Sequence, residues 1–184
     1  MDFTTNLFDM NISLILNCIL IKNKVRSLYI YDNYDDKLDN VSIDQISKLF
    51  PTLHFEKTLS LNSDDTKYDI LISNEKINIS DYDTNSKLGI LLGYPTANHF
   101  PIGKEDKKNG YYNYIIKVDL IKNTKVILFS FVAKDDSKDD EIRSFLSKIQ
   151  IALESETLSK YIKDIYISKT KRTINKILQL SFLY

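Results

Sequence analysis

Residues 111–133 read YYNYIIKVDLIKNTKVILFSFVA and contain two strand patterns joined by a short polar turn. The first half alternates, which predicts a strand with one apolar face. Lys122 and Asn123 mark the turn, and residues 125–133 form a continuous apolar run, the pattern of a strand inside a sheet. The segment therefore predicts an antiparallel hairpin. The side chains expected on its apolar face are Tyr112, Tyr114, Ile116, Val118 and Leu120.

Apolar periodicity predicts further strands before the hairpin and helices on both sides of it. Residues 68–73 (YDILIS) have the pattern of a strand buried on both faces, whereas residues 53–61 alternate and place His54 on a solvent face. The expected strands are residues 25–31, 53–61, 68–73, 75–79, 111–120 and 125–133. The expected helices are residues 6–22, 42–50, 85–92, 142–153, 155–165 (with a strand at 164–168 as the alternative) and 174–182.

Three helix starts have capping signals. Thr4 or Thr5 can cap the first helix, whose polar stripe includes Ser13 and Asn17, and Ser42 with Gln45 forms a capping box for the second. Ser137 can cap the helix that follows the hairpin. These elements predict a single α/β (α+β) domain over residues 1–184, with a mixed sheet of about five strands, including one antiparallel hairpin, covered by amphipathic helices.

The composition indicates a folded, soluble, intracellular protein. The chain has 184 residues, is 43% apolar and has a formal net charge of zero, which removes the global basic field expected for nucleic-acid binding. Residues 32–83 are acidic and residues 157–184 are basic. This asymmetry is either ordinary solvated surface or a basis for an anionic partner or for self-association of opposite poles.

Cys18 is the only cysteine in the chain, so no internal disulfide can form. With His54 and His99 as the only histidines, a Cys/His zinc site is also not expected. These features fit a reducing, cytoplasmic compartment. Residues 10–21 are too short and too polar for a membrane span, so no membrane partner is expected. Frequent Asn, Ile, Lys and Tyr suggest a low-GC genome, such as that of a large DNA virus.

Neither a metal ion nor a cofactor is expected. The chain lacks a P-loop, a dinucleotide-binding glycine motif, a zinc-protease motif and an EF-hand loop. Residues 135–141 carry several carboxylates after an apolar strand, a pattern that can hold Mg²⁺ or Ca²⁺. The same carboxylates are favoured at a helix N-terminus by the helix dipole, which is the reading we prefer.

Residues 87–102 (KLGILLGYPTANHFPI) contain two of the chain's four glycines and two of its three prolines. Gly93 is placed to end a helix. The stretch is then either a packing hinge with a buried aromatic or a small polar ligand pocket. The residues of the candidate pocket are Tyr94, Thr96, Asn98 and His99.

The sequence Leu92-Gly93-Tyr94-Pro95 at a helix end, followed by an aromatic residue, resembles a motif of uncharacterised prokaryotic and viral domains. In those domains cysteines often follow the proline, whereas Thr96-Ala97 follows here. The resemblance covers only this short stretch and implies no activity.

A candidate basic surface lies near the C-terminal end and consists of Lys169, Lys171, Arg172 and Lys176. Nearby aromatic residues would suit single-stranded nucleic acid, although an amphipathic helix with outward lysines explains the same pattern. The leading hypothesis is a non-enzymatic protein that binds a protein partner or itself, with an exposed row of Tyr111, Tyr112 and Tyr114 as a supporting feature. The alternatives are a small enzyme or ligand-binding domain with the pocket at residues 94–99 and, third, nucleic-acid binding.

Overall fold

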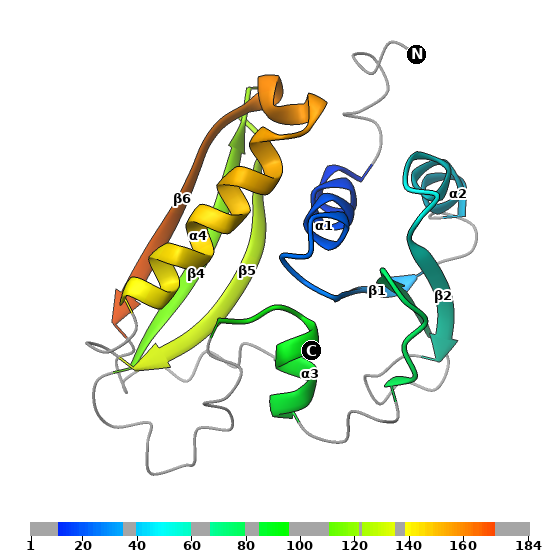
Figure 1. The fold of residues 1–184 in the computed structure, drawn as a ribbon, viewed down its shortest axis with the longest axis horizontal. Helices are drawn as coiled ribbons and strands as arrows, with labels where there is room; N and C mark the ends of the chain where they lie inside the picture. The colour runs from blue at the N-terminus through cyan, green and yellow to red at the C-terminus, as the bar shows by residue number, and fades with distance from the viewer. Residues whose placement is uncertain are drawn as a thin grey trace. The chain divides into compact units, whose positions relative to one another are not determined.

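The described residues form two separate antiparallel sheets of three strands each (Figure 1). The computed structural model describes residues 11–34, 40–59, 67–79, 85–95, 111–121, 123–134 and 139–171. These residues belong to two compact units that meet between residues 77 and 78 of the sequence. Each unit is described by itself, and the expectation of a single domain stays a prediction.

The first sheet consists of β1 (Leu28–Tyr34), β2 (His54–Leu59) and β3 (Tyr68–Ser73) in the order β1-β3-β2. After the exposed Tyr68, every residue of β3 is buried, as the YDILIS pattern predicts for a central strand. His54 is exposed on the edge strand β2, also as expected. β1 runs from residue 28 to 34 and not from 25 to 31. Residues 76–78 have no regular structure, so the short strand expected at 75–79 is wrong.

Helix α1 (Ile12–Lys22) is buried on all sides rather than along one stripe. It starts at Ile12, where the Asn11 side chain accepts a hydrogen bond from the Leu14 amide at 3.1 Å. The expected amphipathic helix over 6–22 is therefore wrong at its start, because α1 begins at Ile12, and in its polar stripe, because Asn17 is buried. Thr4 and Thr5, the expected caps, lie outside the described residues. Asn17 belongs to the core because it has a buried polar partner, described below.

Lys24 ends α1 in the left-handed backbone region, with φ 57°. Its amide donates to the Ile21 carbonyl at 2.9 Å, and the Val25 amide donates to the Leu20 carbonyl at 2.9 Å, a Schellman arrangement that normally favours glycine. A side chain at this φ costs free energy because Cβ approaches the backbone.

The substitution Lys24→Gly is therefore expected to raise the free energy of unfolding by about 0.5–1 kcal/mol. Urea denaturation of the full chain measures the change. Lys22→Gly, at an exposed position in the last turn of the same helix, is the control and should lower the stability by a similar amount. A loss of stability in the Lys24 variant would contradict the expectation.

Helix α2 (Asn40–Leu49) begins two residues before the predicted capping box. Ser42 lies inside the helix, so the box does not mark its start. The helix expected over 42–50 is otherwise confirmed, and its apolar stripe faces inward, because Ile43 and Ile46 are buried and Phe50 is half-buried. The helix ends just before Pro51, as expected.

The second sheet consists of β4 (Tyr111–Leu120), β5 (Lys125–Lys134) and β6 (Ile162–Lys171) in the order β5-β4-β6. The predicted hairpin is confirmed, with Asn123 at φ 57° in its turn. Its apolar second strand, however, lies at the edge of the sheet, not inside it. β5 is apolar because it supplies aromatic side chains to the core on one face of the sheet.

Strand β6 follows a short 3-10 helix, η4 (Thr157–Tyr161), so the helix expected over 155–165 is wrong and its strand alternative is confirmed. Before it, α4 (Asp139–Glu154) lies across the second sheet, in contact with β6 (Figure 1). The helix expected over 142–153 is confirmed; its buried residues are Ile142, Phe145, Ile149, Ala152 and Leu153, and Leu146, expected on the same apolar stripe, is half-buried. The helix expected over 174–182 lies outside the described residues.

The predicted combination of helices with β-sheet is confirmed, but the single mixed sheet of about five strands is not found. The described residues form two three-stranded sheets, and both are entirely antiparallel. β3 and β4 are each the central strand of a sheet with two neighbours of its own. The strands that were expected in one sheet are therefore divided between two. Within the part of the chain that is described, no helix combines the length and apolar character needed to cross a membrane.

Candidate functional site

The second sheet has two chemically different faces, which the strand register defines. Residues opposite each other on paired strands point to the same face. The face that contains Ile116 and Phe129 is packed against α4 through Phe145, and we call it the covered face. The opposite face is called the open face. Its described residues are Asn113, Ile115, Lys117 and Asp119 on β4, Lys125, Ile127, Ser130 and Val132 on β5, and Asp164, Tyr166, Ser168 and Thr170 on β6.

An aromatic cluster fills the covered face. Phe129 and Phe145 meet edge to face with ring centroids 4.8 Å apart, and Tyr114 stacks on Phe131 at 5.5 Å with an interplanar angle of 11°. Tyr94 adds a further edge, 5.9 Å from Phe129 and 6.3 Å from Phe131. These geometries are the favourable ones for aromatic pairs.

Tyr94, the first residue of the predicted pocket, is thus a half-buried packing residue. Helix α3 (Asn85–Leu91) is terminated by Gly93, which lies two residues after its last helical residue and has φ 76°, in the left-handed region. The Tyr94 amide donates to the Gly89 carbonyl at 3.0 Å, which closes a Schellman motif and directs the ring toward the sheet. The predicted helix stop with a packed aromatic is confirmed. Thr96, Asn98 and His99 lie outside the described residues, so the pocket stays a prediction.

The row of tyrosines expected at the surface is largely internal. Tyr114 is 2% exposed, Tyr112 is half-buried, and the side chain of Tyr111 lies outside the description. Burial of Tyr114 counts against partner binding through this row. The predicted apolar face of the strand is, by contrast, confirmed, since Ile116, Val118 and Leu120 are also buried.

Of the candidate basic surface, only Lys169 can be located in full. It is exposed, and its ammonium nitrogen lies 4.5 Å from the Tyr112 ring centroid and 5.5 Å from that of Tyr114. Such cation–π contacts hold the lysine against its own sheet. Lys171 ends β6, but its side chain, like Arg172 and Lys176, lies outside the described part of the chain. The basic surface therefore stays a prediction.

The open face differs from the covered face in burial and composition. None of its described side chains is buried, and Ile127 is 55% exposed. Half-buried Ile115 and Val132 extend the apolar character from Ile127, while the rest of the face is polar. Among its described charged side chains two lysines balance two aspartates: Lys117, Lys125, Asp119 and Asp164.

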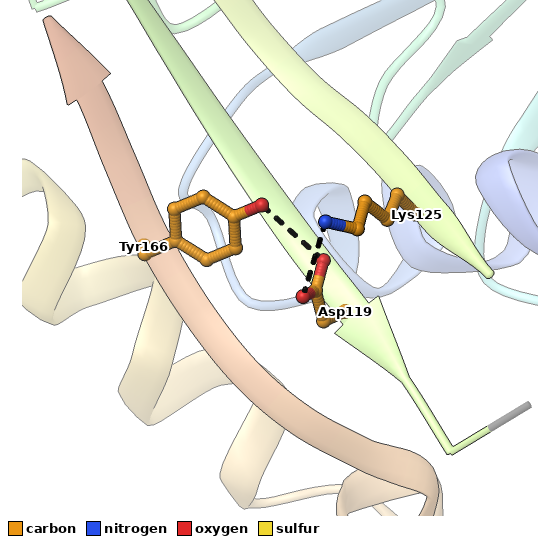
Figure 2. Close-up of polar contacts among 3 residues, drawn as sticks. All are labelled: Asp119, Lys125 and Tyr166. Carbon is orange, nitrogen blue, oxygen red and sulfur yellow. Dashed lines mark hydrogen bonds and ion pairs between the residues drawn. The ribbon is translucent and has the colours of Figure 1, made fainter. Parts of the chain in front are cut away.

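Asp119 is the centre of the polar part of this face (Figure 2). The Tyr166 hydroxyl donates to Asp119 Oδ1 at 3.4 Å, and Lys125 Nζ lies 3.8 Å from Oδ2. Asp164 is directly opposite Asp119 on β6, so a like charge is present on the other side. The Lys125 ammonium and the Tyr166 hydroxyl offset this repulsion. The hydrogen bond to Asp119 also holds the Tyr166 ring over the sheet. Because Lys125 is 63% exposed, the ion pair itself contributes at most about 1 kcal/mol.

The polar feature of the first unit is a buried pair of side chains, Arg26 and Asn17. Arg26, 4% exposed, donates through Nη1 to Asn17 Oδ1, and its guanidinium carbon lies 5.5 Å from the Tyr29 ring centroid. Burial raises the pKa of Tyr29, and the neighbouring Arg26 charge lowers it. Burial also raises the pKa of Cys18 to about 12, so this thiol is not a nucleophile at neutral pH.

Within the described ranges, no group of three or more His, Cys, Asp or Glu side chains is arranged to hold a metal ion. The carboxylates at Asp135 and Asp136 lie outside those ranges. Comparisons of the chain with protein-family models, with curated proteins and with solved structures found no match.

Sequence reasoning predicted the β4–β5 hairpin and the apolar face of β4, but it expected Tyr112 and Tyr114 at the surface, whereas Tyr114 is buried and Tyr112 half-buried. The alternation in residues 111–120 assigns residues to both faces of the strand. The open face could have been recognised from its polar residues, Asn113, Lys117 and Asp119. A strand that is apolar on one face and mixed on the other has its mixed face toward solvent. Tyrosines are hard to assign from sequence, because the hydroxyl group can be solvated at the surface while the apolar ring can pack in the core.

Proposed function

We propose that the chain is a protein-binding module whose second unit binds a protein partner on the open face. The observation that carries the proposal is the exposed mixture of apolar and charged side chains on this face, with Ile127 at 55% exposure and with half-buried Ile115 and Val132 on the same face. Protein interfaces combine an apolar centre with a polar rim and are depleted in charge at the centre. On the open face Ile115 lies on the central strand between Ser130 and Ser168, Ile127 and Val132 lie on the edge strand β5, and the described charged residues gather toward the Asp119 end.

Tyr166 strengthens the case for a protein partner. Its hydroxyl is held by Asp119, so the ring is partly ordered before binding and loses less conformational entropy when it is covered. Tyrosine is also one of the residues enriched in interface centres. Nucleic acid is disfavoured on this face, because Lys117 and Lys125 are balanced by aspartates and phosphate binding needs an excess of cations.

A photoreactive amino acid at position 127 tests the proposal. In lysate of the source cells, the full chain should form a discrete crosslink to a protein, which is then identified and purified. The matched control is position 151, because Ile151 is 67% exposed in the same unit but lies on α4, away from the open face. Crosslinks of equal yield at both positions would contradict the proposal.

With the purified partner, Ile127→Asp is expected to weaken binding at least about tenfold, since it replaces the most exposed apolar side chain of the open face with a charge. Ile151→Asp should bind like the unmodified chain. If the crosslinked protein is a second copy of the chain, light scattering should show that Ile127→Asp shifts the equilibrium to monomer. Equal affinities of the two variants would refute binding at the open face.

A further inference from the structure

The side chains of the open face lie in rows across the three strands, and the row at one end is charged. In this end row Lys125 on β5 is opposite Asp119 on β4, and Asp119 is opposite Asp164 on β6 (Figure 2 shows Lys125 and Asp119). Both outer residues are exposed. The row therefore has a cation on one edge strand and an anion on the other.

A β-bulge in β5 determines the composition of the next row. Phe129 and Ile127 pair with successive residues of β4, so Leu128 between them is an extra residue. Bulges re-aim side chains, and this one places Ile127 on the open face although Phe129 is on the covered face. The row then has Ile127 on one edge strand, Lys117 in the centre and Tyr166 on the other edge strand.

Two copies of such a face can meet around a two-fold axis that lies in the plane between them. Packed sheets keep their strand directions within about 30° of each other, so the axis runs either across the strands or along them. An axis across the strands sets the charged end row of one copy on the opposite end row of the other. That row, Val132, Asn113 and Thr170, has no charge to offer.

An axis along the strands pairs unlike groups instead. Because β4 is the central strand, β5 of one copy then lies over β6 of the other. Lys125 of each copy faces Asp164 of the other, and Ile127 faces Tyr166, so each contact is made twice. The outer strands of the open face are thus complementary to each other in charge and in apolar character.

The central strand lies on this axis, so its residues meet their own counterparts. Ile115 meets Ile115 in an apolar contact. Lys117 and Asp119 would each meet a like charge, but they occupy neighbouring rows, within the reach of a lysine side chain. Lys117 of one copy can therefore pair with Asp119 of the other, which offsets the repulsion.

We propose that the open face binds the open face of a second copy of the chain with the axis along the strands, which names the partner of the proposed function and rests on it. Three strands of 10 residues, about 4.8 Å apart and about 3.3 Å per residue, cover roughly 500 Å² of each copy. Stable interfaces bury about 800 Å² per partner. The dimer is therefore weak, with a dissociation constant of roughly 10 μM or more.

Sedimentation velocity of the full chain at concentrations from about 10 μM to about 1 mM tests the proposal. Lys125→Asp and Asp164→Lys each place like charges in both of the outer contacts, so each variant alone should self-associate at least about tenfold more weakly. In an equimolar mixture of the two variants both contacts again join opposite charges. The mixture should associate within about threefold of the unmodified chain.

Lys148→Asp and Glu154→Lys are the matched controls. They make the same changes of net charge at exposed positions of α4, away from the open face. Each control alone should associate like the unmodified chain, and their mixture should do no better, because attraction between copies of opposite net charge is then the only new effect. Equal losses in the open-face and control variants would overturn the proposal, as would a mixture of open-face variants that stays monomeric.

If the charge variants do not fold, amide NMR of the unmodified chain on dilution decides the question. The signals of Ile115, Ile127 and Tyr166 should move with concentration, while those of Arg143 and Lys148 on α4 stay fixed. A chain that is monomeric at about 1 mM, or signals that move only outside the open face, would overturn the second copy as partner. The proposed function would survive that result if position 127 still crosslinks to a different protein in preference to position 151.

Discussion

Replacement of Phe129 by alanine is expected to lower the free energy of unfolding by about 3–5 kcal/mol. Phe129 is 1% exposed and contacts both Phe145 and Tyr94 in the aromatic cluster. The substitution removes a fully buried ring and leaves a cavity that the stacked Tyr114–Phe131 pair is poorly able to fill, because its own geometry is fixed by the sheet. A loss of this size is a large part of the stability of a small domain.

Chemical denaturation of the full chain measures the effect, with Ile127→Ala as the matched control. Ile127 is on the same strand but is 55% exposed, so its truncation is expected to change the stability by no more than about 0.5 kcal/mol. Similar losses in the two variants would mean that the covered and open faces have been exchanged. The comparison therefore checks the orientation of the sheet on which the proposed binding surface depends.

The fold was predictable where burial leaves a simple period in the sequence. The YDILIS run predicted a central strand, and the alternation of residues 111–120 predicted which side chains of β4 are buried. Both patterns reflect only the burial of one strand by the elements directly around it. The number of sheets depends on which strands pair over long sequence distances, and the apolar run of β5 gave no sign that it lies at an edge.

Helix starts were predicted less well, because several residues can cap. Thr4, Thr5 and Asn11 all have side chains that can accept from a helix amide, and the Asn11 side chain caps α1. Ser42 and Gln45 form a capping box in sequence, yet α2 begins at Asn40. Local capping contributes only about 1 kcal/mol, so packing of the apolar stripe determines where the helix begins.

The candidate site and the other polar pairs were harder to predict because their residues are individually ordinary. Asp69 is a single carboxylate in a strand expected to be buried, and Asp32 is one of many acidic residues between residues 32 and 83. Only a register shift between β1 and β3 places them together. The same holds for Tyr166 and Asp119, which are separated by 47 positions in the sequence.

The buried Asn17–Arg26 pair gives a second large expected effect in the first unit. Asn17→Leu is nearly isosteric and suits the apolar surroundings of α1, but it removes an acceptor of the Arg26 guanidinium at a site where Arg26 is only 4% exposed. A guanidinium has only donors, so a lost acceptor in the interior is expensive. The expected loss is about 2–3 kcal/mol, measured by chemical denaturation.

A double-mutant cycle separates this electrostatic cost from a change in packing. Arg26→Met removes the charge and keeps an apolar side chain of comparable reach. Once the charge is gone, Asn17→Leu should cost little, because leucine then faces methionine in an apolar site. The double variant is therefore expected to be more stable than the sum of the single losses predicts, by about 1–3 kcal/mol. Additive losses would show that Asn17 serves α1 only through its 2.8 Å hydrogen bond to the Ser13 carbonyl, and that Arg26 is held by other partners.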